Sequence, residues 1–457
     1  MGSDWKEVSL GEIGRVVTGK TPKTKVIENF GHEIPFITPR DMDDQRIISE
    51  TERYLSKVGS VSVKNSIIPA NSISVSCIGS DMGKSAITKY LSVTNQQINS
   101  IVVSDEFYYK FVYYNLSSRK AEIRGLAGGS AQPILNKSDF SQIKMFVPPL
   151  TEQKAIAYIL GSLDDKIELN RQMNETLEAM AQALFKSWFV DFDPVIDNAL
   201  AAGNAIPDEF FERAELRKGI EKKDNSDIQS LFPDEFEFTE EMGWIPKGWQ
   251  ELQIKDIAKV VKGKSYKSSE LSESETALVT LKSFKRGGGY RLDGLKEYTG
   301  KYKEEQEVKA GDLVIAYTDV TQAADLIGKP AMVIDDIRYK HLVISLDVAV
   351  VRPEIDSQKY YLYGLAQTEA FQSHNYSHST GTTVLHLSKN AVPDYYLCLP
   401  SENLLHGFTK IVEPLFTSVN NNIGEIRNLE KLRDTLLPKL MSGELRIPDA
   451  EVLVENV

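Results

Sequence analysis

The stretch WKEVSLGEIGRVVTGK at residues 5–20 decides the fold, because it returns later in the chain as WQELQIKDIAKVVKGK at residues 249–264. Both copies begin with tryptophan, carry glutamate two residues later and end in Gly-Lys, at Gly19-Lys20 and Gly263-Lys264. A match of this length at a constant offset indicates an internal repeat. A chain of 457 residues is also too long for one ordinary core. The sequence therefore predicts two equivalent domains.

The two halves remain alike beyond this motif. MGKSAI at 82–87 is matched by IGKPAM at 327–332, and GSAQPILNKSDFSQIKMFVPP at 129–149 by GTTVLHLSKNAVPDYYLCLP at 381–400. Short β-rich runs such as IPFIT and DLVIAYT mix with short helical runs in both halves. We therefore expect two compact α+β lobes, the first lobe at residues 1–148 and the second lobe at residues 249–400.

The segment SCIGSDMGKSAIT at 76–88 is similar to the phosphate-binding loop of ATPases. That loop needs Gly, four residues and then Gly-Lys-Ser/Thr, because its backbone N–H groups curl around the phosphate. Ile78 stands where the first glycine is required, and in the second copy Pro330 stands where Ser or Thr is required. We interpret the repeated Gly-Lys as a structural turn and not as an ATP site.

A long helical pattern follows each lobe, opening at a capping residue, Thr151 or Ser401. Alternating spacings of four and three residues are typical of a coiled-coil seam. The seam positions are Ile156, Leu160, Leu163, Ile167, Asn170, Asn174, Leu177, Ala181, Leu184 and Trp188, and then Val412, Phe416, Val419, Ile423 and Ile426 before the register slips to Leu429, Leu432 and Leu436. We expect spacer helices at 149–192 and 401–443 that pack antiparallel on each other.

The net charge of −12 is unevenly distributed along the chain. In residues 191–248 acidic side chains outnumber basic ones by more than two to one, and the end of the chain is acidic as well. We expect an acidic connector at 193–248 and a tail at 444–457. The rest of the chain is balanced, so the lobes are free to present local basic faces to nucleic acid.

The chain carries no apolar run long enough to span a membrane, and its first residues, MGSDWKEV, lack the apolar stretch of a secretory signal. We therefore expect a cytoplasmic protein. Cys77 and Cys398 both lie in apolar strand-like runs, which favours buried reduced thiols over a disulfide or a metal site.

The sequence contains no complete catalytic motif of a methyltransferase or a nuclease. VPPL at 147–150 lacks the polar residue of an amino-methyltransferase turn, and DMDD at 41–44 is interpreted as a solvated turn and not as a nuclease centre. His374 and His378 have the spacing of a metal pair without a third ligand. The sequence therefore predicts no catalytic residue and no metal site.

Basic loops punctuated by glycine occur in both lobes. GKTPKTK at 19–25 is compared with KGKSYK at 262–267, so Lys20, Lys23 and Lys25 are expected to correspond to Lys262, Lys264 and Lys267. Such side chains neutralise phosphates, and segments that differ between the copies are better placed to read bases. The candidate DNA-binding residues are Lys20, Lys23, Lys25, Arg40, Arg124, Gln132, Lys262, Lys264, Lys267, Lys282, Lys285, Arg286, Arg291, Thr382 and Thr383.

The segment LFKSWFVDF at 184–192 carries more apolar residues than one narrow seam needs. Phe185, Trp188 and Phe189 are candidates for a surface that docks partner subunits. Packing of the helix against a lobe is the alternative for the same residues.

Three stretches resemble the specificity subunit of type I restriction-modification enzymes: PPLTEQKAIAYILGSLDDKIELNRQMNETLEAMAQALFKSWFVDFDP at 148–194, GWIPKGWQ at 243–250 and LEKLRDTLLPKLMSGEL at 429–445. The resemblance covers nearly the whole chain. It implies two pseudo-twofold-related α+β target recognition domains, each for one half of a split DNA sequence. It further implies that two long antiparallel coiled-coil helices separate these domains and dock methyltransferase subunits.

By the same resemblance the chain is a non-catalytic subunit that binds double-stranded DNA, two modification (methyltransferase) subunits and restriction (translocase and endonuclease) subunits, with no membrane partner. S-adenosylmethionine, ATP and Mg²⁺ then belong to the partners, and no cofactor is expected on this chain. Two other function classes stay open from the residues alone: a coiled-coil adaptor that does not bind DNA, and a stand-alone DNA methyltransferase or nuclease.

Overall fold

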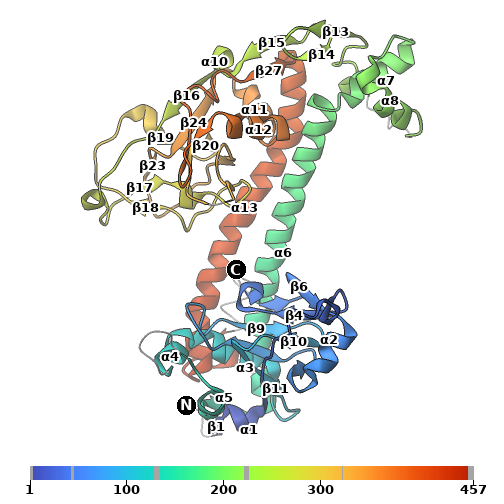
Figure 1. Cartoon of the computed structure of the whole chain (residues 1–457). Coiled ribbons are helices and arrows are strands. Elements are labelled where there is room, and N and C mark those ends of the chain that lie inside the picture. Colours follow the sequence, from blue (N-terminus) through green and yellow to red (C-terminus); the bar gives the residue numbers. More distant parts are fainter. Residues whose placement is uncertain (1–3, 43–45, 128–133, 221–225, 322, 451–457) are drawn as a thin grey trace. The chain divides into compact units, whose positions relative to one another are not determined.

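The computed structural model describes residues 4–42, 46–127, 134–220, 226–321 and 323–450 (Figure 1). The chain forms two compact units: unit 1 combines Met1–Arg171 with Ile423–Val457, and unit 2 is Gln172–Asn422. Each unit contains one lobe together with part of each long helix, α6 (Leu150–Phe189) and α13 (Glu402–Met441).

The first lobe is built on two five-stranded sheets, ordered β2-β11-β8-β9-β5 and β3-β6-β4-β10-β7. The pairs β10–β4 and β5–β9 are parallel, and β1 pairs with β12 beside the sheets. The strands are β1 (Lys6–Ser9), β2 (Gly14–Thr18), β3 (Phe30–Gly31), β4 (Ile34–Ile37), β5 (Ile47–Ile48), β6 (Arg53–Leu55), β7 (Ile67–Ile68), β8 (Ile73–Ser76), β9 (Ser85–Thr88), β10 (Ser92–Thr94), β11 (Ile98–Val103) and β12 (Lys144–Val147). The helices are α1 (Leu10–Ile13), α2 (Lys57–Ser62), α3 (Tyr109–Ser118), α4 (Lys120–Gly125) and α5 (Lys137–Gln142).

The second lobe repeats this topology with the sheets β16-β24-β20-β22 and β18-β17-β23-β19. Its parallel pair β17–β23 corresponds to β4–β10, and β15–β27 corresponds to β1–β12. The strands are β15 (Gln250–Gln253), β16 (Ala258–Lys262), β17 (Thr276–Val279), β18 (Lys296–Glu297), β19 (Glu307–Val308), β20 (Leu313–Ala316), β22 (Pro330–Met332), β23 (His341–Ile344), β24 (Val348–Pro353) and β27 (Tyr396–Leu399), with β21 (Thr318–Asp319), β25 (Ser379–Thr380) and β26 (Leu385–Leu387) in an added sheet. The helices are α10 (Ile254–Ile257), α11 (Lys359–Ala366) and α12 (Glu369–Ser377). The predicted repeat of two α+β lobes is confirmed.

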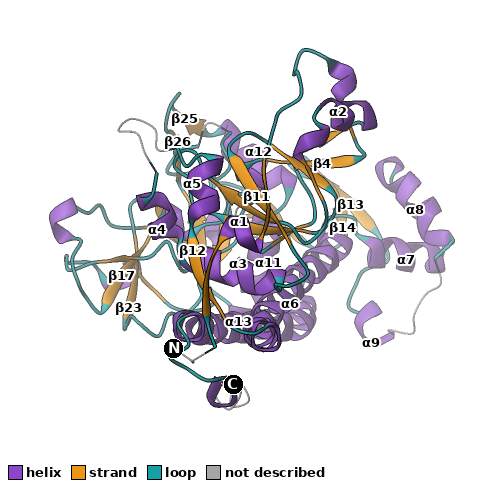
Figure 2. Ribbon diagram, turned by 90° about the horizontal axis from the view of Figure 1, so that it is seen from below, coloured by secondary structure: helices purple, strands orange, loops and turns teal. Residues whose placement is uncertain are grey.

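The long helices lie side by side (Figure 2), and within unit 1 their hydrogen bonds show that they run antiparallel, as predicted. Arg433 Nη1 donates to Asp164 Oδ1 at 2.9 Å, and further along α6 Asn170 Nδ2 donates to Glu425 Oε2 at 2.8 Å. Apolar seam residues complete a core shared with the first lobe: Ile156, Leu160, Leu163, Ile167, Leu429, Leu436 and Leu440. Burial of this apolar stripe stabilises the pairing.

Within unit 2 the pairing is also antiparallel. Asn422 Nδ2 donates to Asn174 Oδ1 at 2.8 Å, and nearer the end of α6 the rings of Trp188 and Phe408 lie 5.8 Å apart. The two asparagines that interrupt the predicted seam, Asn170 and Asn174, are thus each hydrogen-bonded to a polar partner on α13.

The acidic connector is folded and joins the core of unit 2. It contains α7 (Asp193–Ala202), α8 (Phe211–Lys218) and the hairpin β13 (Phe236–Thr239)–β14 (Gly243–Pro246). The Arg213 guanidinium donates to Asp193 at 2.7 and 2.8 Å, and Arg217 Nε donates to Asp197 at 3.1 Å. These ion pairs neutralise part of the negative charge, and the buried connector residues Val195, Phe232 and Ile245 belong to the core. The sequence missed this folding because its apolar residues are widely spaced among acidic ones.

The Asn174–Asn422 hydrogen bond predicts a double-mutant cycle with strong coupling. Replacing Asn174 alone by leucine is expected to destabilise unit 2 by about 1–3 kcal/mol, because Asn422 loses its partner. Replacing both by leucine should recover most of that loss, since the two apolar side chains satisfy each other in the seam. Urea denaturation of the four variants measures the coupling, and purely additive effects would contradict it.

Candidate nucleic-acid interface

Backbone hydrogen bonds gather five segments at one end of the first lobe, which we call its loop edge: residues 19–20, 37–40, 77, 94–98 and 135. The bonds run from Gly19 N to Ile98 O (3.0 Å), Lys20 N to Thr94 O (2.9 Å), Asn95 N to Ile37 O (2.9 Å), Cys77 N to Gln97 O (2.7 Å) and Leu135 N to Cys77 O (2.9 Å). The ends of β2, β4, β8 and β10 and the start of β11 therefore meet at one surface, where their loops leave the sheets.

The second lobe has the same loop edge, formed by residues 263–264, 279–282, 317, 344–348 and 387. The corresponding bonds run from Gly263 N to Val348 O (2.9 Å), Lys264 N to Ile344 O (2.8 Å), Ser345 N to Val279 O (2.9 Å), Tyr317 N to Asp347 O (2.7 Å) and Leu387 N to Tyr317 O (2.8 Å). These bonds define which residues of the two lobes are equivalent, independently of the sequence alignment.

The glycine before each loop-edge lysine is required by the backbone packing. A Cβ atom on Gly19 would lie 1.9 Å from Asn95 O, and one on Gly263 would lie 2.2 Å from Ser345 O. No other residue fits such a close approach of two backbone segments. The repeated Gly-Lys of the opening motif thus positions the lysine at the loop edge.

The second repeated Gly-Lys, at Gly83 and Gly328, forms a turn between two antiparallel strands. Gly83 has φ 87° and Gly328 has φ 70°, and their N–H groups donate to Ser76 O (2.8 Å) and Ala316 O (2.9 Å). Each turn leads into a strand, β9 or β22, whereas a phosphate loop opens a helix. The interpretation as a structural turn is confirmed.

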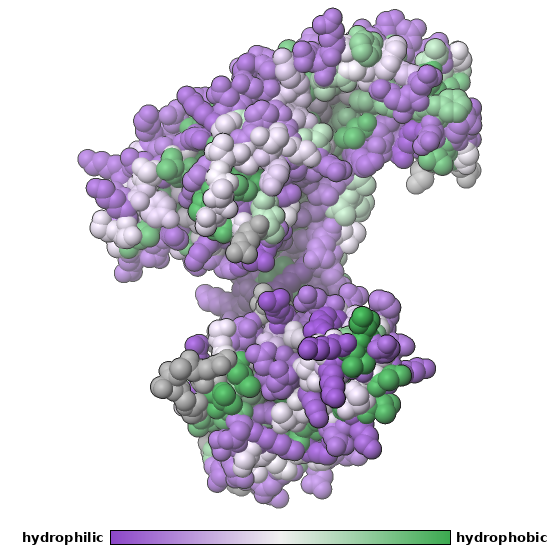
Figure 3. Space-filling view, viewed as in Figure 1, coloured by the Kyte–Doolittle hydropathy of each residue, from purple (hydrophilic) through white to green (hydrophobic). Residues whose placement is uncertain are grey.

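Two pairs of predicted cations occupy equivalent places at the loop edges. Lys20 and Lys264 follow the glycines just described, and Arg40 and Lys282 lie in the short turns that follow β4 and β17. Lys20, Arg40 and Lys282 are exposed, and Lys264 is half-buried. Hydrophilic side chains cover most of the molecular face seen in Figure 3.

The expected correspondence of the other basic residues is wrong. Lys262 pairs with Ala349 at the position where Thr18 pairs with Asn99, so its counterpart is Thr18 and not a lysine. The chain then reaches a 3₁₀ turn at Ile27–Asn29 in the first lobe and at Ser268–Glu270 in the second, so the intervening loops differ in length. Lys23, Lys25 and Lys267 lie along these loops, where Lys23 O accepts from Val26 N and Lys267 N donates to Glu270.

The glycine-rich loop of the second lobe brings further cations to its loop edge. Gly287 N donates to Asp325 O and Gly289 N to Pro330 O, which places the exposed Lys285 and Arg286 beside the start of β22. Arg291 is already paired, with Nε 3.0 Å from Asp293 Oδ1. Burial raises the pKa of Glu178 on α6, and the positive charge of Lys285 partly offsets that rise.

Thr382 and Thr383 are exposed in the tight turn between β25 and β26, and Leu387 lies at the other end of this hairpin, where it pairs with Ser379. Arg124 is exposed on α4. Gln132 lies outside the residues that the structure describes.

One equivalent pair of cations was missed by the sequence analysis. Lys137 and Lys389 each stand two residues after the loop-edge leucine, Leu135 or Leu387, and both are exposed. The aligned segments ILNKSDF and LHLSKNA already contained this signal, because the Leu-Xaa-Lys spacing is the same in both copies.

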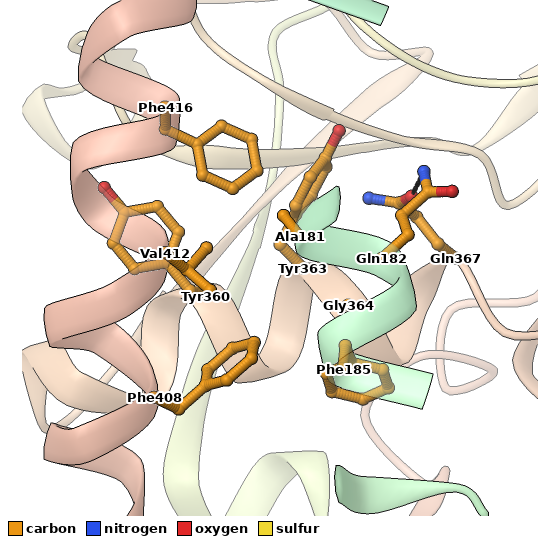
Figure 4. Close-up of a pocket in the computed structure, with 10 residues that line it drawn as sticks. All are labelled: Ala181, Gln182, Phe185, Tyr360, Tyr363, Gly364, Gln367, Phe408, Val412 and Phe416. Carbon is orange, nitrogen blue, oxygen red and sulfur yellow. Dashed lines mark hydrogen bonds between the residues drawn. The ribbon is translucent and has the colours of Figure 1, made fainter. Parts of the chain in front are cut away.

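Phe185, Trp188 and Phe189 are core residues, and the structure corrects their interpretation as a docking surface. Their exposed fractions are 3%, 7% and 8%. Figure 4 shows the Phe408 ring from α13 pointing toward Phe185 from α6, with Gly364 of α11 beside Phe185. A Cβ atom on Gly364 would lie 2.3 Å from the Phe185 ring, so this glycine makes the room that the ring fills. These residues pack the helix against the second lobe, which is the alternative that the sequence left open.

The remaining candidates for chemistry have structural partners. His374 Nε2 lies 2.9 Å from Ala391 O, and its ring stacks on His378 with centroids 4.1 Å apart. Burial raises the pKa of the Cys77 thiol to about 11 and that of Cys398 to about 12. Across residues 4–450, apart from the undescribed gaps, no three His, Cys, Asp or Glu residues are grouped to hold a metal ion. Nor does any helix in the described ranges have the length and apolarity needed to cross a membrane.

Comparison with known proteins places these features in one family. A sequence model described as "Type I restriction modification DNA specificity domain" matches residues 2–179 and 246–430. The chain is 28% identical to the type I restriction enzyme MjaIX specificity subunit of Methanocaldococcus jannaschii, over 98% of this chain and 94% of that protein. It is 24% identical to the type I restriction enzyme HindI specificity subunit of Haemophilus influenzae, over 97% of this chain and 100% of that protein.

A solved structure shares the fold. The crystal structure of the S subunit of a type I restriction-modification system from M. genitalium superposes with a TM-score of 0.52 at 17% identity, covering 96% of this chain and 97% of that chain. The two matched regions of the family model each include one loop edge and the start of one long helix. This chain therefore belongs to the type I restriction-modification DNA specificity family, with one specificity domain in each half.

Proposed function

We propose that this chain is the DNA-recognition subunit of a type I restriction-modification complex and that each lobe binds one half of a split target through its loop edge. The observation that carries this proposal is the recurrence of three cations at equivalent positions of the two loop edges: Lys20 and Lys264, Arg40 and Lys282, and Lys137 and Lys389. Phosphates are present at every DNA sequence, so contacts to them suit residues that both copies share.

Base reading belongs, in this proposal, to the parts of the loop edges that differ between the lobes. In the second lobe these include Lys285, Arg286, Thr382 and Thr383, which have no repeated counterpart. Two lobes that bind different half-sites must differ where they touch bases, because only base edges carry sequence information.

We also propose that the chain is non-catalytic and acts with two methyltransferase subunits and with restriction subunits. Membership of the specificity family supports this division of labour. S-adenosylmethionine, ATP and Mg²⁺ would be bound by those partners. The long helices would set the gap between the half-sites, since each has 40 residues and spans about 60 Å.

Neutralising the shared lysines is expected to weaken DNA binding without changing its sequence preference. In the complex with methyltransferase subunits, the double variant Lys20→Gln/Lys264→Gln should lower the slope of log K against log salt by about 0.9 for each phosphate that the protein no longer neutralises. Lys255→Gln is the matched control, because Lys255 is exposed on α10, at the opposite end of β16 from Lys262, and pairs with Asp394 at 3.0 Å. An unchanged slope in the double variant would favour the adaptor that does not bind DNA.

Mapping of methyladenine in cells that carry the chain with its partners tests the split target directly. We expect a bipartite motif with a fixed gap, and exchange of residues 249–400 for those of a relative should change one half only. Deleting four residues, about one turn, from one spacer helix should alter the gap. A continuous motif, or none, would overturn the proposed function.

A further inference from the structure

Lys262 differs from the other cations at the loop edge of the second lobe, because an aromatic ring fixes it. Its Nζ lies 4.5 Å from the centroid of the Tyr317 ring, and the side chain is half-buried. A cation held over a ring face is attracted by the ring electrons and loses rotamer freedom. Lys262 is therefore an oriented donor rather than a freely moving surface charge.

The ammonium group of Lys262 lacks a charge partner. In the described part of the chain no carboxylate pairs with it, and burial together with the nearby charge of Lys389 lowers its pKa. A desolvated ammonium beside a second cation gains from an acceptor oxygen or nitrogen brought by a ligand.

The equivalent place in the first lobe is neutral and self-satisfied. Thr18 Oγ1 donates to Asn99 Oδ1 at 2.7 Å, and Asn99 Nδ2 donates to Leu135 O at 3.2 Å. In the second lobe Lys262 replaces Thr18, Ala349 replaces Asn99 and Tyr317 replaces Cys77. Together, these three differences mean that the second lobe lacks the internal hydrogen bonds of the first lobe and has instead a cation above an aromatic ring.

We propose that Lys262 is a specificity-determining residue of the second lobe, which donates to the acceptor edge of a base, of the guanine O6/N7 kind, in the second half-site. The proposal rests on the proposed function. Lysine is suited to that edge, because guanine presents two adjacent acceptors in the major groove. Lys389, which has the equivalent Lys137 in the first lobe, remains the phosphate contact beside it.

The test uses the complex of this chain with methyltransferase subunits and a duplex library in which both half-sites are randomised, with methylated products sequenced. Lys262→Met keeps the apolar stem over Tyr317 and removes the charge. It should relax the preference at one position of the second half-site by about 5- to 150-fold and leave the first half-site unchanged. Lys262→Arg should keep the preference, because arginine donates to the same guanine edge.

Lys264→Met is the matched control, since Lys264 is shared with the first lobe and should lower methylation of all sequences alike. A uniform loss for Lys262→Met, with a smaller salt slope, would assign Lys262 to a phosphate and overturn the inference. No change for Lys262→Met while Lys264→Met weakens binding would also overturn it, but would leave the proposed function standing. If Lys262→Met, Lys264→Met, Arg40→Gln and Lys282→Gln all left DNA binding and methylation unchanged, both the inference and the proposed function would be wrong. Thermal unfolding of each variant confirms that the second lobe stays folded.

Discussion

Replacing Phe408 by alanine is expected to lower the free energy of unfolding of unit 2 by about 3–5 kcal/mol. The Phe408 ring lies 6.1, 5.8 and 5.0 Å from the rings of Phe185, Trp188 and Phe189. Its removal opens a cavity at the junction of α6, α13 and the second lobe, and the aromatic pairs disappear in addition. Urea denaturation measures the loss of stability, and hydrogen exchange should show that the destabilised amides lie in unit 2.

The matched control is Phe211→Ala, because Phe211 is 58% exposed on α8 and should change stability by less than about 0.5 kcal/mol. Polar replacements of Phe185 and Phe189 should likewise lower the free energy of unfolding of unit 2. If such variants instead stayed as stable as the parent and failed only to co-purify with a methyltransferase subunit, the core assignment would be wrong and the docking interpretation would stand.

Removing the Asp164 carboxylate should strongly destabilise unit 1. Asp164 Oδ1 accepts from Arg433 Nη1 at 2.9 Å, Asp164 Oδ2 accepts from Tyr114 Oη at 2.6 Å, and Arg46 Nη1 lies 3.7 Å away. Burial raises the pKa of Tyr114, so its hydroxyl stays a donor at neutral pH. Asp164→Ala would leave Arg46 and Arg433 without this shared acceptor and destabilise unit 1 by about 3 kcal/mol.

Asp434→Ala supplies the comparison, because it removes the other carboxylate that Arg433 contacts, at 2.8 Å. The Asp434 side chain is 64% exposed, so this surface pair should contribute about 0–1 kcal/mol. Calorimetry of both variants separates the two cases. Equal destabilisation by the two substitutions would mean that the interactions of Asp164 with Arg46 and Tyr114 contribute nothing.

The repeat and the helical seam could be predicted because each leaves a local signal in the sequence. Gly19 and Gly263 mark the same close backbone approach, and Asn170 and Asn174 stand at the expected polar positions of the seam. Equivalence of individual lysines could not be predicted beyond the first glycine. The loops after Gly19 and Gly263 differ in length. Lys262 stands before Gly263, where the constant offset of the two opening motifs already aligns it with Thr18, and the strand pairing agrees.

The role of the aromatic residues at the end of α6 depended on distant parts of the chain. Phe185 and Phe189 pack against Tyr361 and Phe408, which are far away in the sequence. Helical spacing alone shows an excess of apolar residues but not what covers them. The same holds for the connector, whose Val195 and Phe232 find their core partners only in the folded unit.

The discontinuous composition of unit 1 has a consequence for synthesis on the ribosome. Unit 2 is one continuous segment, whereas unit 1 needs Ile423–Val457 to complete it. Leu429, Leu436, Leu440 and Ala450 from that last segment are buried in the core that holds Ile156 and Leu163. Domains generally fold from the N-terminus as they emerge. In this chain the lobe that emerges first is finished last, so a nascent chain stopped after residue 422 exposes the apolar seam of unit 1 to chaperones and proteases while unit 2 is already complete.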